Sequence, residues 1–516
     1  MKKQNFIQAA SVIALAQLLV KIIGAFYKIP LDRFILQTEG MGIFSTAYTI
    51  FNWLLVVSTV GLPVAISKIV AEKTALSKAY EAYRVFVVAR RFLLAIGLVG
   101  FSVMFFGTKI FADVMNAPSA WMAIAAIAPS VLFVSLNSSY RGYYQGRQNM
   151  IPTAVSEVIE AVLKLVLGIL LAYMLKLAFE PISYAATGAV TGVMLGTFAS
   201  FAFLSLYHLK VVRKEKPVCS ENESVPEWKA TLLEIIKIAV PVTLGASVFT
   251  ISSLIDTALV MDRLSILGYA EAERFSLYGY LNRAITMFNM PLTIISAITV
   301  SVVPMISHEL SLKNKLMAED YIRKTFKISV FASLPCAIGL AVLSENIFLL
   351  MYGDGAHSTL LVLMGIAVLF AVLSQITTSI LQAYGKVWWP VINMAIGAVV
   401  KIVVSYNLVA NPVFNINGAS VGTICCYLTV TVLNIIRIKS ITKMKLGIKD
   451  FIIKPSFLAI VTFLAAFFTV KFISNVIPSN IIQVGITVIV TAIVYFAVLF
   501  AIKGITKEEL MLIKRR

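Results

Sequence analysis

Charged side chains are scarce in this sequence of 516 residues. Only 13% of the residues are Asp, Glu, Lys or Arg, and 59% are hydrophobic. Soluble domains have about 25% charged and 45–50% apolar residues. The apolar residues fall in runs of roughly 20, the length that a helix needs to cross about 30 Å of hydrocarbon. The composition therefore excludes an ordinary soluble domain and predicts a chain that crosses a membrane many times.

Cysteine and histidine are also rare, with four and three residues respectively. The cysteines have no metal-ligand spacing and indicate no disulfide framework. The sequence has neither a phosphate-binding glycine loop followed by lysine nor a Gly-x-Ser-x-Gly nucleophile elbow. We therefore expect no catalytic residues, no cofactor and no firm metal site, and we predict a transporter rather than an enzyme.

Positive charge is abundant but unevenly placed. The net charge is +19, and 33 of the 44 Lys and Arg residues lie in alternate loops that would share one side of the membrane. This bias is typical of cytosolic loops and predicts that both termini are cytosolic. No basic stripe with interleaved aromatic residues lies on a soluble module, so we expect no nucleic-acid partner.

The hydropathy pattern predicts an all-α polytopic membrane protein with about fourteen spans. We place them near residues 6–30, 41–68, 88–110, 119–140, 152–175, 182–207, 232–261, 276–306, 325–350, 358–382, 388–408, 416–436, 451–473 and 481–502. The predicted domains are an N-lobe (1–210), a cytosolic linker (211–230), a C-lobe (231–440), and two extra helices with a cytosolic tail (441–516).

The two lobes look like repeats at an offset of 237 residues. The stretch GIFSTAYTIFN at 42–52 matches GYLNRAITMFN at 279–289, and the same offset places 161–164 on 398–401. Six helices per repeat is an even number, so both repeats have the same orientation. The symmetry axis then runs along the membrane normal, with a cavity between the lobes.

Charges inside the spans are the candidates for substrate binding. A Lys or Arg at the bilayer centre costs about 2.5–3.5 kcal/mol on insertion scales, so it normally faces a cavity or a partner. Lys21 and Lys28 are nearly two turns apart and point the same way; Lys28 alternatively extends to the outer headgroups. The candidate set is Lys21, Lys28, Arg283, Glu157, Glu160, Lys164 and Lys401.

Three of these charges share one face of the predicted fifth helix. Glu157, Glu160 and Lys164 follow each other at i, i+3 and i+7, and the spacing predicts a direct pair between Glu160 and Lys164. Both a structural pair and a role in the pathway remain open for them. Lys401 is the repeat partner of Lys164. An arginine among such cations suits a diphosphate, because its planar fork donates two hydrogen bonds at once.

Three stretches carry a family resemblance: KIIGAFYKIP at 21–30, VGLPVAISK at 60–68 and RGYYQGRQNMIPT at 141–153. Together with the 6+6+2 helix pattern, they resemble the polysaccharide-biosynthesis and stage V sporulation protein B branch of the multidrug/oligosaccharidyl-lipid/polysaccharide (MOP) exporter superfamily. This branch is related to MurJ-type lipid II flippases. The resemblance covers nearly the whole chain.

The resemblance implies two lobes around a cationic cavity, with Lys21 and Arg283 at basic positions of the first and eighth helices. It also implies a groove for a polyprenyl tail along the last two helices. Asp256 and Asn393 resemble part of a sodium site of some relatives, although Gly397 stands where that site has a carboxylate. Asn282 likewise stands where an acidic residue usually precedes the arginine.

The sequence therefore predicts a flippase that moves lipid II to the outer leaflet of the bacterial cytoplasmic membrane by alternating access. The alternatives are a flippase for a teichoic-acid or capsular polyprenyl-linked oligosaccharide, a cation-coupled multidrug exporter, and a non-transporting scaffold. Coupling to Na+, to H+ or to the membrane potential alone stays open. We expect a monomer whose partners are the bilayer, a polyprenyl diphosphate-linked sugar and the cell-wall synthesis machinery, in vegetative growth or in sporulation.

Overall fold

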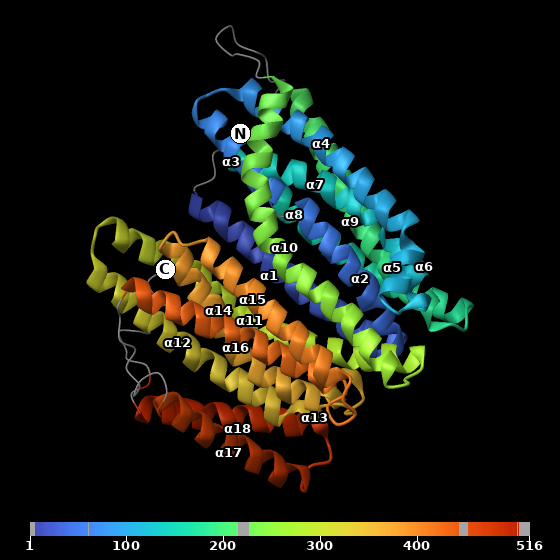
Figure 1. Cartoon of the computed structure of the whole chain (residues 1–516), viewed down its shortest axis with the longest axis vertical. Coiled ribbons are helices and arrows are strands. Elements are labelled where there is room, and N and C mark those ends of the chain that lie inside the picture. Colours follow the sequence, from blue (N-terminus) through green and yellow to red (C-terminus); the bar gives the residue numbers. More distant parts are fainter. Residues whose placement is uncertain (1–5, 60, 215–226, 443–452, 503, 505–516) are drawn as a thin grey trace. The chain divides into compact units, whose positions relative to one another are not determined.

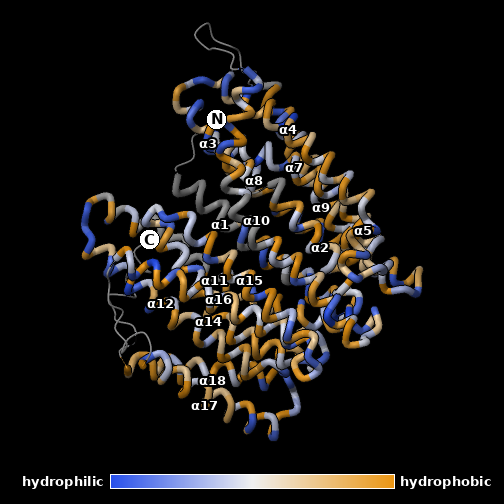
Figure 2. Tube along the Cα trace, viewed as in Figure 1, coloured by the Kyte–Doolittle hydropathy of each residue, from blue (hydrophilic) through white to orange (hydrophobic). Residues whose placement is uncertain are grey.

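The computed structural model describes residues 6–59, 61–214, 227–442, 453–502 and 504. Every regular element in these ranges is a helix, which confirms the all-α prediction. Apolar residues run along the full length of most helices (Figure 2), as expected of segments surrounded by lipid. Contacts divide the chain into two compact units, residues 1–279 and 280–516, and each is described by itself.

The first unit holds ten helices and the start of an eleventh within its described residues (Figure 1). They are α1 (Phe6–Pro30), α2 (Gln37–Thr59), α3 (Gly61–Ala75), α4 (Ala79–Phe106), α5 (Thr108–Val114), α6 (Trp121–Ile127), α7 (Pro129–Gly146), α8 (Ile151–Ala178), α9 (Ile182–Lys214), α10 (Trp228–Ile266) and the first residues of α11 (Glu271–Ser311). A π-helical turn η1 (Leu31–Leu36) follows α1, and a short turn η2 (Pro118–Ala120) precedes α6.

The second unit takes the rest of α11 and the helices that follow it. They are α12 (Lys315–Val342), α13 (Ser344–Tyr352), α14 (Thr359–Ala383), α15 (Trp388–Val409), α16 (Asn417–Thr442), α17 (Lys454–Ser474) and α18 (Asn480–Ala501). Residues 215–226 of the predicted linker and residues 505–516 of the predicted tail lie outside the described residues.

Within the described residues, eleven segments are long and apolar enough to cross a membrane. The first of them, Leu19–Ala75, covers two of the predicted spans. The predicted seventh and eighth spans correspond to α10 and α11, which have 39 and 41 residues. The helices therefore agree with a polytopic membrane protein of about fourteen spans.

One local prediction was wrong. Residues 31–40 were expected to form a loop, but they are helical, and Leu31, Ile35 and Leu36 are buried in the unit. The predicted span 119–140 lies within the candidate membrane span Pro118–Gly146 and consists of two helices, α6 and α7. Pro129 is the first residue of α7, and because proline has no backbone N–H it starts a helix better than it continues one.

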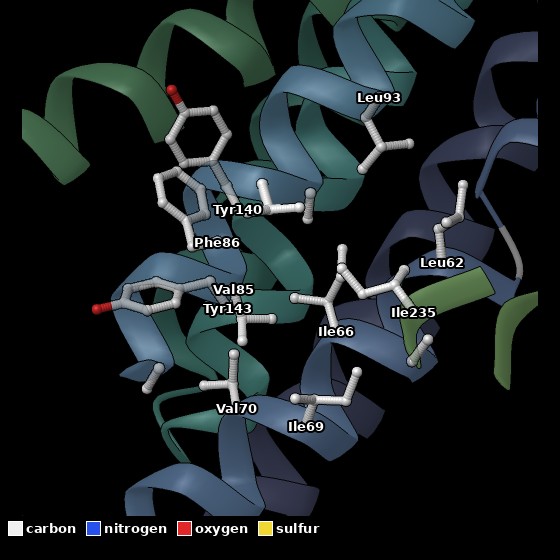
Figure 3. Close-up of a cluster of buried hydrophobic side chains, with 14 of the residues drawn as sticks. Leu62, Ile66, Ile69, Val70, Val85, Phe86, Leu93, Tyr140, Tyr143 and Ile235 are labelled. Carbon is white, nitrogen blue, oxygen red and sulfur yellow. The ribbon is translucent and has the colours of Figure 1, made fainter. Parts of the chain in front are cut away.

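Each unit has an apolar core that a few helices share. In the first unit, Leu62, Ile66 and Val70 of α3 pack against Val85 and Phe86 of α4, with rings of α7 and Ile235 of α10 beside them (Figure 3). In the second, Phe331 and Leu334 of α12 pack with Leu458, Tyr495 and Leu499, which come from α17 and α18. The hydroxyl of Tyr495 donates to the carbonyl of Phe331. The two extra helices are thus attached to α12 of their own unit.

The structure supports the repeat predicted from the sequence. Adding 237 to the first residues of α4, α8 and α9 gives the first residues of α12, α15 and α16 to within two residues. The repeat also appears as a reciprocal contact inside the first unit. A Cβ on Gly42 would clash with the carbonyl oxygen of Phe275, and a Cβ on Gly279 would clash with that of Thr38. Both pairs of residues are related by the same offset, so α2 and α11 cross as equivalent partners.

We predict that Gly42→Ala and Gly279→Ala each destabilise the protein by about 1–3 kcal/mol, because the added methyl group overpacks a backbone contact. The measurement is thermal unfolding of the detergent-solubilised chain. Gly339→Ala and Gly485→Ala are matched controls, since a Cβ at either position meets no atom within 4 Å. Equal Tm values for the two pairs of variants would contradict the crossing.

Candidate functional site

The two lysines of α1 lie in different surroundings. Lys21 is exposed on the first unit, whereas Lys28 is half-buried near the end of the helix. Lys28 is within electrostatic range of Lys164 on α8 and of Asp32 in the turn that follows α1. The structure therefore places two of the predicted cations near each other, with one carboxylate close to Lys28.

Lys164 is held between two aromatic side chains. Its ammonium lies 4.8 Å from the ring centre of Tyr48 and 5.4 Å from that of Tyr27, and it donates to the Tyr48 hydroxyl at 3.5 Å. The Tyr27 hydroxyl donates to the carbonyl of Ala189 at 3.0 Å, which fixes its ring. Aromatic faces stabilise a cation without neutralising it. Positive charge thus gathers where α1, α2 and α8 meet.

Glu160 does not pair with Lys164 as predicted. Its carboxylate accepts a hydrogen bond from Nη2 of Arg141 at 3.0 Å, and the same guanidinium donates to Ser156 and Ser200 at 3.3 and 3.2 Å. A planar guanidinium at this distance competes well with an ammonium one turn away. Glu157 is also within range of Arg141. The charges of α8 therefore have two kinds of partner. Glu157 and Glu160 face Arg141 of α7, whereas Lys164 faces tyrosine rings.

Arg283 of α11 is the most deeply buried of the predicted cations. Its side chain is 3% exposed, and its guanidinium carbon lies 5.0 and 4.8 Å from the ring centres of Tyr280 and Tyr352. The carboxylate of Asp354 lies 3.7 Å from Nη1. Sequence reasoning found no acidic neighbour for Arg283, because Asp354 is far along the chain, in the loop after α13.

Asp354 is an ionised carboxylate in this setting. Burial raises its pKa. Hydrogen bonds from Tyr280 and the Ala356 N–H, together with the charges of Arg283 and His357, lower the pKa by more than burial raises it, so the pKa is below its ordinary value. The positive neighbours and donors favour the charged form. Of the partners of Asp354 and Arg283, Tyr280 could have been found from the sequence, since it lies one turn before Arg283 on the same helix face.

Lys401 is a predicted cation of the second repeat. Lys401 is half-buried on α15, and a Cβ on Gly422 of α16 would lie 3.2 Å from its carbonyl oxygen. Gly196 of α9 approaches Lys164 in the same way, with its Cβ position 3.2 Å from the Lys164 backbone nitrogen. Each repeat lysine thus lies on a helix closely packed against a glycine.

The predicted cation site takes one residue from each unit and stays a prediction. Asp256 is buried on α10 in the first unit. Asn393 is buried on α15 in the second, where it donates to Asn434 at 2.7 Å. A Cβ on Gly397 would lie 2.6 Å from Val430, so the packing of α15 on α16 leaves no room for a carboxylate there. Among the described residues, no group of three or more His, Cys, Asp or Glu side chains could hold a metal ion.

Polar contacts tie the hairpin between α10 and α11 to the loop between α5 and α6, at the end of the first unit that is predicted to face outward. Asn116 donates to Asp262 at 3.2 Å, and the Ser119 N–H donates to Glu271 at 2.8 Å. Arg274 donates to the Asn116 carbonyl at 3.1 Å. These bonds lie beside the crossing of α2 and α11.

We predict that Arg141 and Glu160 are energetically coupled. A double-mutant cycle with Arg141→Gln and Glu160→Gln should give a coupling energy of about 0.5–3 kcal/mol, because each single change leaves a partly buried charge without its partner. The measurement is unfolding of the chain in mixed micelles. The matched cycle with Glu157→Gln should give a smaller value, and a larger one would contradict the pairing seen here.

Two family models match this chain and overlap over residues 241–309. The family model for "Polysaccharide biosynthesis protein" matches residues 6–309, and the model "MatE" matches residues 241–407. Stage V sporulation protein B of Bacillus subtilis is 24% identical over 99% of this chain and 98% of its own length. The lipid II flippase MurJ of the same organism is 22% identical over 84% of this chain and 82% of its own length.

Two solved structures share the fold. An inward-facing multidrug resistance transporter of the MATE family, in the MOP superfamily, has a TM-score of 0.69 and 14% identity, and covers 86% of this chain and all of its own. The lipid II flippase MurJ in an inward closed conformation has a TM-score of 0.67 and 16% identity, and covers 94% of this chain and 97% of its own. With its many apolar helices and a family model that spans more than half of the sequence, this chain is a multi-pass bacterial membrane protein that belongs to the polysaccharide biosynthesis protein family.

Proposed function

We propose that this protein is a flippase that moves lipid II, a lipid-linked peptidoglycan precursor, from the cytosolic to the outer leaflet. The observation that carries the proposal is a set of cations within apolar helices: Lys28 and Lys164 in the first unit and Arg283 in the second. Cations in a membrane interior normally mark a polar pathway. A diphosphate that joins a sugar to a polyprenyl chain is an anion that such cations could bind.

Two details favour an anionic substrate over a cationic one. The Lys164 ammonium lies against tyrosine rings, which stabilise a cation without supplying a negative charge. The nearby carboxylate of Glu160 is occupied by Arg141 and is not directed to Lys164. The two relatives whose names mention sporulation and lipid II agree with a wall-precursor role.

Alternating access also needs contacts that hold one face shut and then release. The bonds of Asn116 with Asp262 and of Ser119 with Glu271 are suited to this, because they lie between a loop and the ends of two helices. Outward movement of an anion is favoured by about 2.3 kcal/mol per charge for each 100 mV of potential that is negative inside. The membrane potential could therefore give direction to transport without a nucleotide; coupling to Na+ or H+ remains the other route.

The same groups would serve a teichoic-acid or capsular polyprenyl diphosphate, since only the sugar differs. A multidrug exporter is the second candidate function, favoured by the match of residues 241–407 to the MatE model. Its substrates are typically cationic and would meet Lys28 and Lys164 unfavourably. Resistance to cationic drugs on overexpression, with no effect on wall synthesis, would favour the exporter.

Neutralising the proposed ligands should abolish function in a cell. We predict that Lys164→Gln and Arg283→Gln fail to rescue a strain depleted of its lipid II flippase, while membrane protein levels stay normal. Arg283→Lys should rescue only partly, because it keeps the charge and loses the fork. Lys109→Gln, an exposed lysine on α5, is the matched control and should rescue fully. Full rescue by both of the first two variants would defeat the proposed roles.

A further inference from the structure

In the second unit, a carboxylate lies next to Arg283, the residue proposed to bind the diphosphate. Asp354 lies 3.7 Å from the buried Arg283 guanidinium, while its own side chain is 44% exposed. A buried arginine thus has a partly exposed carboxylate beside it. A phosphate approaching Arg283 from this side meets a negative charge already in place.

The position of Asp354 is built by its neighbours. Gly353 ends α13 in the left-handed conformation, with φ of 78°, which turns the chain sharply before Asp354. The Tyr280 hydroxyl donates to one carboxylate oxygen, and the Ala356 N–H donates to the other at 2.9 Å. Tyr280 also presents its ring to Arg283. One tyrosine therefore orients both members of the pair.

The distance between the two charges suits a pair that opens. A separation of 3.7 Å is longer than a charge-assisted hydrogen bond of about 2.7–2.9 Å. A phosphate can offer closer bonds than this carboxylate, and the exposed side of Asp354 allows it to turn away into water. Because the Asp354 side chain is 44% exposed, water can solvate its carboxylate when a ligand takes its place beside Arg283.

Building on the proposed function, we propose that Asp354 is the exchangeable counterion of Arg283: it orients the guanidinium in the empty protein, yields to the diphosphate on binding, and returns to promote release. Asp354 is a positioning residue in this scheme, since it acts through Arg283. It supplies from a distant loop the acidic partner that Asn282 does not provide on the helix itself.

The test is equilibrium binding of undecaprenyl diphosphate to the full chain in lipid nanodiscs. Asp354→Asn should bind about two- to fivefold more tightly than the wild type, because the competing charge is gone. Glu345→Gln is the matched control: it removes an exposed carboxylate of α13 from the same part of the unit and should leave the affinity unchanged. The affinity of Asp354→Glu should equal that of the wild type or lie between the affinities of the wild type and Asp354→Asn.

The variants in this binding experiment distinguish a failure of this inference from a failure of the proposed function. Wild-type or weaker binding by Asp354→Asn, with Arg283→Gln impaired, overturns the counterion role alone. Unchanged binding by Arg283→Gln, or no binding by the wild type, overturns both. Tyr280→Phe keeps the ring and removes the hydroxyl, so it should tighten binding less than Asp354→Asn; a loss of thermal stability in both variants without tighter binding would make Asp354 merely a structural residue of the loop.

Discussion

The main physical constraint on this protein is that a cation among apolar helices needs a partner. Arg141, Lys164 and Arg283 each have a different kind of partner. Arg141 is hydrogen bonded to Glu160 and two serines, Lys164 lies between tyrosine rings, and Arg283 combines two rings with the carboxylate of Asp354. The first cation is hydrogen bonded to a carboxylate, whereas Lys164 relies on aromatic rings and Arg283 on rings and a carboxylate at 3.7 Å.

Close helix packing provides the frame for these charges. Glycines bring α2 and α11 into backbone contact, and others bring α9 against the helix of Lys164 and α16 against the helix of Lys401. In lipid, helices have little hydrophobic drive to associate, so small residues that permit close approach take that role. The repeat makes the same arrangement available twice, which is why lysines at 164 and 401 occupy corresponding helices.

Hydropathy and charge spacing could predict the all-α fold, about fourteen spans, the repeat offset and the buried arginine, since each is encoded in the local pattern. The partners could not be predicted. Spacing along one helix suggested that Glu160 joins Lys164, but the stronger partner is Arg141, which was assigned to a loop because α7 was expected to end before it. Asp354 meets Arg283 only through the turn at Gly353, a contact of the tertiary structure that no helix periodicity reveals.

The central claim is that these cations carry a diphosphate lipid across the bilayer. The most direct measurement is translocation of labelled lipid II in liposomes that contain the purified protein, with the headgroup in the outer leaflet quantified over time. The account predicts protein-dependent exchange that Arg283→Gln abolishes and Lys109→Gln preserves. Equal exchange with and without protein, or an Arg283→Gln variant as fast as the wild type, would contradict it.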